Sequence, residues 1–267
     1  MNFLWAVVFT IACQSMWAQE FDLLIKNGHL IDAKNKLDQP MDVAVRDGKI
    51  AEVAARIPAE KAKQVIDAEG LYVVPGLIDM HVHVFHGINQ DQYIANSFTS
   101  LPPDGFTFRH GVTTVVDAGS SGWRNFKTFR EQTIDNSKTR VLAFINIVGW
   151  GMKGGAVEQN LGDMDPKLTA IVARQNKDVI VGTKLAHYSG HDWTPLERTV
   201  EAGELAGGIP AMIDFGGASP PLSIETLLLE KLRPGDIYAH CYAHVNGRMP
   251  VVDENGKVRP CVHQALS

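Results

Sequence analysis

Short apolar stretches separated by turn residues fill the chain from residue 21 to residue 74. Within them apolar and polar positions alternate, as in FDLLIKNG and MDVAVRDGKIAEVAA. Asn27-Gly28 and Asp47-Gly48 lie between such runs, and both dipeptides favour the tight turn of a β-hairpin. The pattern predicts a small β domain with little helix.

From Pro75 onward the pattern changes to apolar strands separated by longer segments with apolar residues at helical spacing. Strands are expected near residues 77–84, 113–117, 141–147, 179–184, 211–215 and 237–242. Helices are expected near residues 123–134, 166–176, 195–206 and 223–232. A repeated strand-then-helix order predicts parallel pairing, in a barrel or an open sheet.

Polar residues stand at the ends of the predicted strands. In chain order they are His81 and His83, Asp117, Asn146, Lys184, Asp214 and His240. The loops that follow the strands of a parallel barrel converge on one face, where functional residues collect. These side chains are therefore expected to lie together.

The triplet His81-Val82-His83 is a candidate metal site. Residues two apart on a strand point to the same side, so both imidazoles can bind one ion. Such a triplet also arises by chance, and two partly exposed histidines are the alternative. Its position in PGLIDMHVH, at the start of the strand and helix series, favours the metal. His240, in GDIYAHCYAH, is a candidate ligand for a second ion, with a non-ligand role equally open.

Lys184 ends the apolar run VIVGTK, where an unmodified ammonium is costly to bury without a partner. One interpretation is that its stem is buried and its amine reaches water or a carboxylate. The other is that carbon dioxide has carboxylated the amine, which then bridges two metal ions. The residues alone favour neither. Four further histidines in predicted loops either bind substrate or are solvated, and solvation is expected for each: His86, His187, His191 and His244.

The first 18 residues contain an apolar run that predicts a signal peptide cleaved after Ala18, and hence a secreted or periplasmic protein. The run is shorter than the roughly 20 apolar residues that span a bilayer, so the mature chain is expected to have no stable membrane span. Lipid attachment at Cys13 is a minor alternative. The net charge of -5, with scattered basic residues, argues against a nucleic-acid partner.

Four segments resemble the amidohydrolase superfamily, and within it the dihydroorotase-like amidohydrolase/deacetylase branch. They are FDLLIKNGHLID, VIDAEGLYVVPGLIDMHVHVFHG, HGVTTVVDAGSSG and VGTKLAH. The resemblance implies an α/β fold, a TIM-type (β/α)8 barrel with a flanking β-sandwich. The expected domains are a signal peptide at 1–18, an N-terminal β-sandwich portion at 19–74 and a partial hydrolase barrel of about six βα units at 75–267.

The resemblance also implies a site with one or two zinc ions. His81 and His83 match the ligands of the first strand, Lys184 the carboxylated bridging lysine, and His240 the histidine of the sixth strand. Asp117, in VVDAG, matches a position that we interpret either as structural or as supporting the metal ligands. The implied reaction is hydrolysis of a carbon-nitrogen or ester bond in an acylated small molecule by metal-activated water. The oligomeric state stays open, although the exposed edges of an incomplete barrel favour association into a homo-oligomer.

Two features depart from the family. Its fifth strand ends in a histidine ligand, whereas PAMIDFGG places Asp214 there, and a carboxylate also binds zinc. The tail RMPVVDENGKVRPCVHQALS is too short for two more βα units, and no residue is assigned to the family's general-base aspartate. We therefore expect a fragment, a premature stop or an incomplete gene product. The alternative function is a catalytically impaired remnant that at most binds metal.

Overall fold

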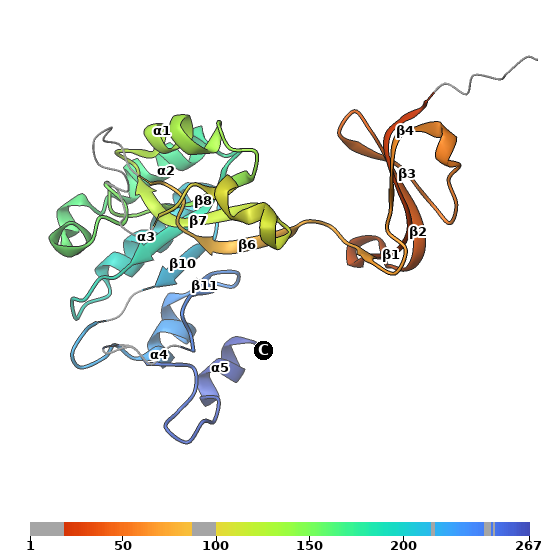
Figure 1. Cartoon of the computed structure of the whole chain (residues 1–267). Coiled ribbons are helices and arrows are strands. Elements are labelled where there is room, and N and C mark those ends of the chain that lie inside the picture. Colours follow the sequence, from red (N-terminus) through yellow and green to blue (C-terminus); the bar gives the residue numbers. More distant parts are fainter. Residues whose placement is uncertain (1–18, 87–99, 215–216, 243–246, 248) are drawn as a thin grey trace, which may run out of the picture. The chain divides into compact units, whose positions relative to one another are not determined.

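The computed structural model describes residues 19–86, 100–214, 217–242, 247 and 249–267 (Figure 1). The predicted leader, residues 1–18, and His244 lie outside the described residues. The chain divides into two compact units, Met1–Pro75 and Gly76–Ser267. Across the described ranges, every helix falls short of the length and apolarity that a membrane span requires.

The first unit is a mixed β-sheet. Its strands are β1 (Phe21–Asp32), β2 (Leu37–Arg46), β3 (Lys49–Ala54), β4 (Ala62–Asp67) and β5 (Tyr72–Val73). The order is β3-β2-β1-β4, with β5 also paired to β1; β2 is antiparallel to both β1 and β3, while β4 and β5 run parallel to β1. A small apolar core forms around Phe21, Leu24 and Ile57.

One of the two predicted hairpin turns in this unit is present. Asp47-Gly48 joins the antiparallel strands β2 and β3, as predicted. The prediction of a hairpin turn at Asn27-Gly28 was wrong, because β1 continues through both residues, with a β-bulge at this point. Asn27 takes the left-handed conformation (φ 61°), but its N–H donates to Asp42 on β2 and its side-chain amide to Asp67 on β4, both at 2.9 Å. Neighbouring strands thus hold an extended chain where the local signal favoured a turn.

The second unit contains a six-stranded, all-parallel sheet in the order β11-β10-β9-β8-β7-β6. The strands are β6 (Leu77–Val82), β7 (Val112–Gly122), β8 (Arg140–Asn146), β9 (Ile180–Ala186), β10 (Ala211–Asp214) and β11 (Ile237–Tyr238). The helices are α1 (Phe126–Phe129), α2 (Pro166–Gln175), α3 (Thr194–Leu205), α4 (Ile224–Thr226) and α5 (Pro260–Ala265), with single π turns extending α1 to Ile134 and α4 to Lys231. The predicted parallel strand and helix architecture is confirmed.

Both faces of this sheet are apolar, as parallel sheets require. Phe126 and Phe129 of α1 pack with Val115 and Ile145 of the sheet. Helix α3 packs on β9 and β10. Figure 1 shows these helices beside the sheet. Val116, Phe144 and Met212 form a cluster of their own with Ala118 and Ala239. Helix α2 begins where predicted because Asp165 accepts hydrogen bonds from the backbone N–H groups of Lys167 and Leu168.

The carboxyl ends of all six strands differ from the predicted positions, by one or two residues except in β7 and β11, where the difference is larger. β7 continues five residues past Asp117 to Gly122, so Asp117 lies inside the strand. β11 stops at Tyr238, so His240 follows the strand in a turn with φ 54°. His83 directly follows β6, and Asp214 is the last residue of β10.

Candidate metal centre

Three of the predicted ligands converge at the carboxyl ends of the parallel strands. One donor atom each from His81, Asp214 and His240 lies within 4.8 Å of the other two. His240 Nδ1 is 3.0 Å from Asp214 Oδ2, and the rings of His81 and His240 are 4.9 Å apart between centroids. Two imidazoles and a carboxylate at this spacing fit a divalent cation.

The two histidines of the HxH triplet have lowered pKa values. Burial, together with the positive charge of Lys184 nearby, lowers the pKa of His81 to about 4. Burial also lowers the pKa of His83. Both rings are therefore neutral near pH 7, which is the form in which an imidazole binds a metal.

His83 lies beside the three-residue cluster and outside it. Its ring centroid is 5.7 Å from that of His81, and its Nδ1 is 3.2 Å from the hydroxyl of Ser120. The buried Asp117 fixes this region, because its carboxylate accepts hydrogen bonds from the backbone N–H groups of Val84, Gly119 and Ser120. The geometry agrees with a structural role for Asp117.

Lys184 is fully buried within β9. Its Nζ is 3.9 Å from Asp214 Oδ2, a long ion pair between two groups that are both withdrawn from water. Its stem lies against Gly119, where a Cβ atom would come within 2.5 Å of Lys184 Cγ, so the strand requires glycine there. For an unmodified lysine, this geometry agrees with the first of the two interpretations of Lys184, in which its stem is buried and its amine reaches a carboxylate.

A cavity of about 660 Å³ opens on these residues. Its wall contains His83, Asp214 and His240 together with two residues that the sequence analysis did not single out as ligands, Glu158 and His187. His187 Nδ1 is 2.8 Å from Glu158 Oε2, and this hydrogen bond raises the pKa of His187. The side chain of His187 is 47% exposed, so water contacts only part of it and the rest contacts protein. Glu158 lies in a short 3₁₀ helix, and no periodicity or motif marks it.

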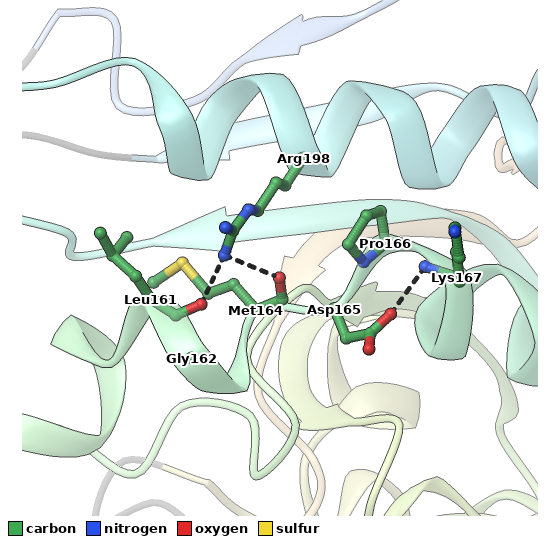
Figure 2. Close-up of a pocket in the computed structure, with 7 residues that line it drawn as sticks. All are labelled: Leu161, Gly162, Met164, Asp165, Pro166, Lys167 and Arg198. Atoms are coloured by element: carbon green, nitrogen blue, oxygen red, sulfur yellow. Dashed lines mark hydrogen bonds between the residues drawn. The ribbon is translucent and has the colours of Figure 1, made fainter.

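Figure 2 shows a second pocket, of about 510 Å³, beside the start of α2. Its polar groups already serve the fold. Arg198 donates to the backbone carbonyls of Leu161 and Met164, and Asp165 caps the helix. Among the described residues that line the pocket, Lys167 is the one further charged side chain, and we assign the pocket no site.

Comparison with known proteins finds relatives in sequence and in structure. A family model described as the Amidohydrolase family matches residues 64–135. A deacetylase of Agrobacterium fabrum is 34% identical over 216 residues, which are 78% of this chain and 50% of that protein. A deacetylase of Enterococcus faecalis is 33% identical over 242 residues, which are 89% of this chain and 58% of that protein. A crystal structure of an adenine deaminase aligns with a TM-score of 0.76 at 30% identity, over 92% of this chain and 63% of that one.

This chain belongs to the amidohydrolase superfamily. It spans about half the length of the curated relatives that it matches. Divalent metals are general in the superfamily, and the donor set of His81, Asp214 and His240 is chemically suited to one.

Proposed function

We propose that this chain carries the metal-binding part of a hydrolase that cleaves a carbon-nitrogen or ester bond of an acylated small molecule. The observation that best supports the proposal is the convergence of His81, Asp214 and His240 beside the buried Lys184. Neutral imidazoles and a carboxylate are the ligands that zinc prefers, so zinc is the proposed metal. The relatives named deacetylases support the reaction class.

A bound divalent metal supplies a Lewis acid and a water that ionises near neutral pH. The protein's part is to hold the ligands in place before the ion arrives. Asp117 fixes the backbone at Val84, directly after His83, and Asp214 orients His240 through their 3.0 Å contact. The adjoining cavity of about 660 Å³ is large enough for a small-molecule substrate.

Carboxylation of Lys184 is proposed to accompany metal binding. The unmodified ammonium, 3.9 Å from Asp214, balances the charge of that carboxylate. A carbamate on Lys184 would instead put two anions next to each other in a buried site, which is unfavourable unless cations lie between them. Lys184 is thus expected to be unmodified in the metal-free protein and carboxylated in the metal-bound protein.

A protein that binds metal without efficient turnover is the second candidate. Asp214 supports it, because an anionic ligand in place of a neutral imidazole adds negative charge around the metal and reduces its Lewis acidity. A screen of acetylated amides and esters with the metal-loaded protein distinguishes the two. Hydrolysis above the metal-free background supports the hydrolase, and metal binding without it supports the second candidate.

Export and self-association are also proposals. Cleavage after Ala18 predicts a mature chain that starts at Gln19, which N-terminal sequencing of the secreted or periplasmic protein tests. The mass of the purified chain in solution tests the homo-oligomer.

The experiment that tests the metal site is elemental analysis of the purified chain and of Lys184→Ala. One or two zinc ions per chain are expected, with a sharp decrease in Lys184→Ala. Lys177→Ala, at an exposed lysine, is the matched control and should keep the wild-type content. A folded wild-type chain with little or no metal contradicts the proposed function.

A further inference from the structure

His187 is held in a defined position beside the cluster. It directly follows β9 and has a left-handed backbone (φ 56°), a strained conformation for a residue with a side chain. Its N–H donates to the backbone carbonyl of Asp214 at 2.8 Å. Its ring is bonded through Nδ1 to Glu158, which is 2% exposed and also accepts a hydrogen bond from the N–H of Gly154.

The residue after Glu158 fixes the same loop from its backbone side. The amide of Gln159 donates to the carbonyl of His187 at 2.9 Å and accepts from the N–H of Ser189 at 2.9 Å. Consecutive side chains of one 3₁₀ helix, Gly155–Gln159, therefore hold the ring and the strained backbone of His187. Such a construction fixes where the free ring nitrogen points.

That free nitrogen, Nε2, lies 3.8 Å from Asp214 Oδ2. The distance is too long for a hydrogen bond. It matches two ligands of one ion, because metal-ligand bonds of about 2.0 Å allow ligand atoms to be up to about 4 Å apart. His240 Nδ1 contacts the same oxygen from 3.0 Å. Asp214 is thus flanked by two imidazole nitrogens from different loops.

We propose that His187 is a further ligand of the metal centre, binding through Nε2, and that Glu158 is its positioning residue. The inference rests on the proposed function, since it needs a metal ion at Asp214. A carboxylate that accepts the other ring N–H fixes the tautomer and the orientation of a metal-binding histidine. A histidine that binds a metal is neutral, so His187 as a ligand adds a neutral donor next to the anionic Asp214.

The test is a cobalt titration of the metal-free chain, followed by its visible absorption, which reports the ligands of the ion. His187→Asn removes the ligand, and asparagine tolerates the left-handed backbone. Glu158→Gln keeps the size of the positioning side chain. His191→Ala, at an exposed histidine in the same loop, is the matched control. Circular dichroism checks that each variant is folded.

Glu158→Gln is expected to weaken cobalt binding 10- to 100-fold, and His187→Asn at least as much, with a changed spectrum. His191→Ala should match the wild type. Wild-type affinity and spectrum in His187→Asn would overturn the inference and leave the proposed function standing. A wild-type chain that binds no cobalt overturns both.

Discussion

The two units of the chain each bury an aspartate, and the surroundings of the two carboxylates differ. Asp42 in the first unit is 3% exposed, and Asp214 in the second is 2% exposed. Asp42 accepts short hydrogen bonds from Lys26 Nζ at 2.8 Å, Asn27 N at 2.9 Å and Ile57 N at 2.8 Å. Asp214 instead has three titratable side chains at 3.0 to 3.9 Å.

Equal burial therefore does not mean an equal role. Backbone N–H groups at hydrogen-bonding distance fix a carboxylate and balance its charge, so Asp42 stabilises the fold. Histidine and lysine side chains at longer distances can change protonation and can share an ion with the carboxylate, which is typical of functional sites. Asp117 shows the same contrast within the second unit, because its three donors are all backbone N–H groups.

The largest effect on stability is expected for Asp42→Ala. The change removes the carboxylate from a largely buried ammonium, which keeps only the carbonyl of Ile57 as acceptor, and leaves two backbone N–H groups without theirs. This costs about 3–5 kcal/mol. Hydrogen exchange followed by mass spectrometry should show faster exchange across β1 and β2. Asp38→Ala is the control, because its exposed pair with His29 contributes about 0–1 kcal/mol. Equal effects of the two changes would refute the structural role of Asp42.

Acid should weaken the same unit. Burial raises the pKa of Asp42, but the hydrogen bonds from Lys26, Ile57 and Asn27 together lower it below 3.8. A lowered folded pKa contributes stability above the unfolded value, and this is lost as pH falls through the folded value. Exchange across β1, corrected for the intrinsic pH dependence of amide exchange, should therefore rise as the pH falls below 3.8. Asp42→Asn should lack this acid dependence, and an unchanged dependence in that variant would exclude Asp42 as its source.

Metal removal should affect the second unit only. A ligand at 100 times its dissociation constant stabilises the folded state by about 2.7 kcal/mol. A chelator should thus lower the unfolding midpoint reported by the tryptophans of the second unit, Trp123, Trp150 and Trp193. Exchange rates in β1 and β2 should not change. A chelator effect of the same size in Lys184→Ala would show that the bound ion is somewhere else.

Asp117→Asn should cost less, about 1–3 kcal/mol, because one buried N–H group loses its acceptor. If the amide oxygen still accepts from Gly119 and Ser120, the new NH₂ group faces the N–H of Val84. The displacement of Val84 should also weaken metal binding through its neighbour His83. Chemical denaturation followed by tryptophan fluorescence measures the stability. Asp135→Asn, on the surface, should stay within about 0.5 kcal/mol of the wild type.

The sequence predicts the elements better than it predicts their details. Apolar runs in β8 and β9 and the cap at Asp165 are local signals, and the strands and α2 begin close to the predicted residues. Asn27-Gly28 was misjudged because Asp42 and Asp67, 15 and 40 residues away in sequence, decide its conformation. A local pattern contains no information on such contacts.

In the candidate site too, the sequence predicts some of the residues and misses others. Strand ends identify His81, Asp214 and His240, because parallel strands bring their carboxyl ends together. The pair of Glu158 and His187 joins a short 3₁₀ helix to a loop 29 residues further along the chain, and neither segment has a periodicity from which a contact follows. His187 was visible as a histidine three residues after Lys184, but only the structure shows its partner.

The smallest effect is expected at the bulge next to Asp42, and it separates backbone strain from hydrogen bonding. Asn27→Ala should destabilise the first unit by about 1–2 kcal/mol, because alanine disfavours the left-handed backbone and the bond to Asp67 is lost. Asn27→Gly loses the same side-chain bond but accepts the backbone, so its effect should be smaller. Both variants keep the N–H that donates to Asp42. Equal exchange rates in the two variants would mean that the bond to Asp67, and not the backbone conformation, is why asparagine is needed there.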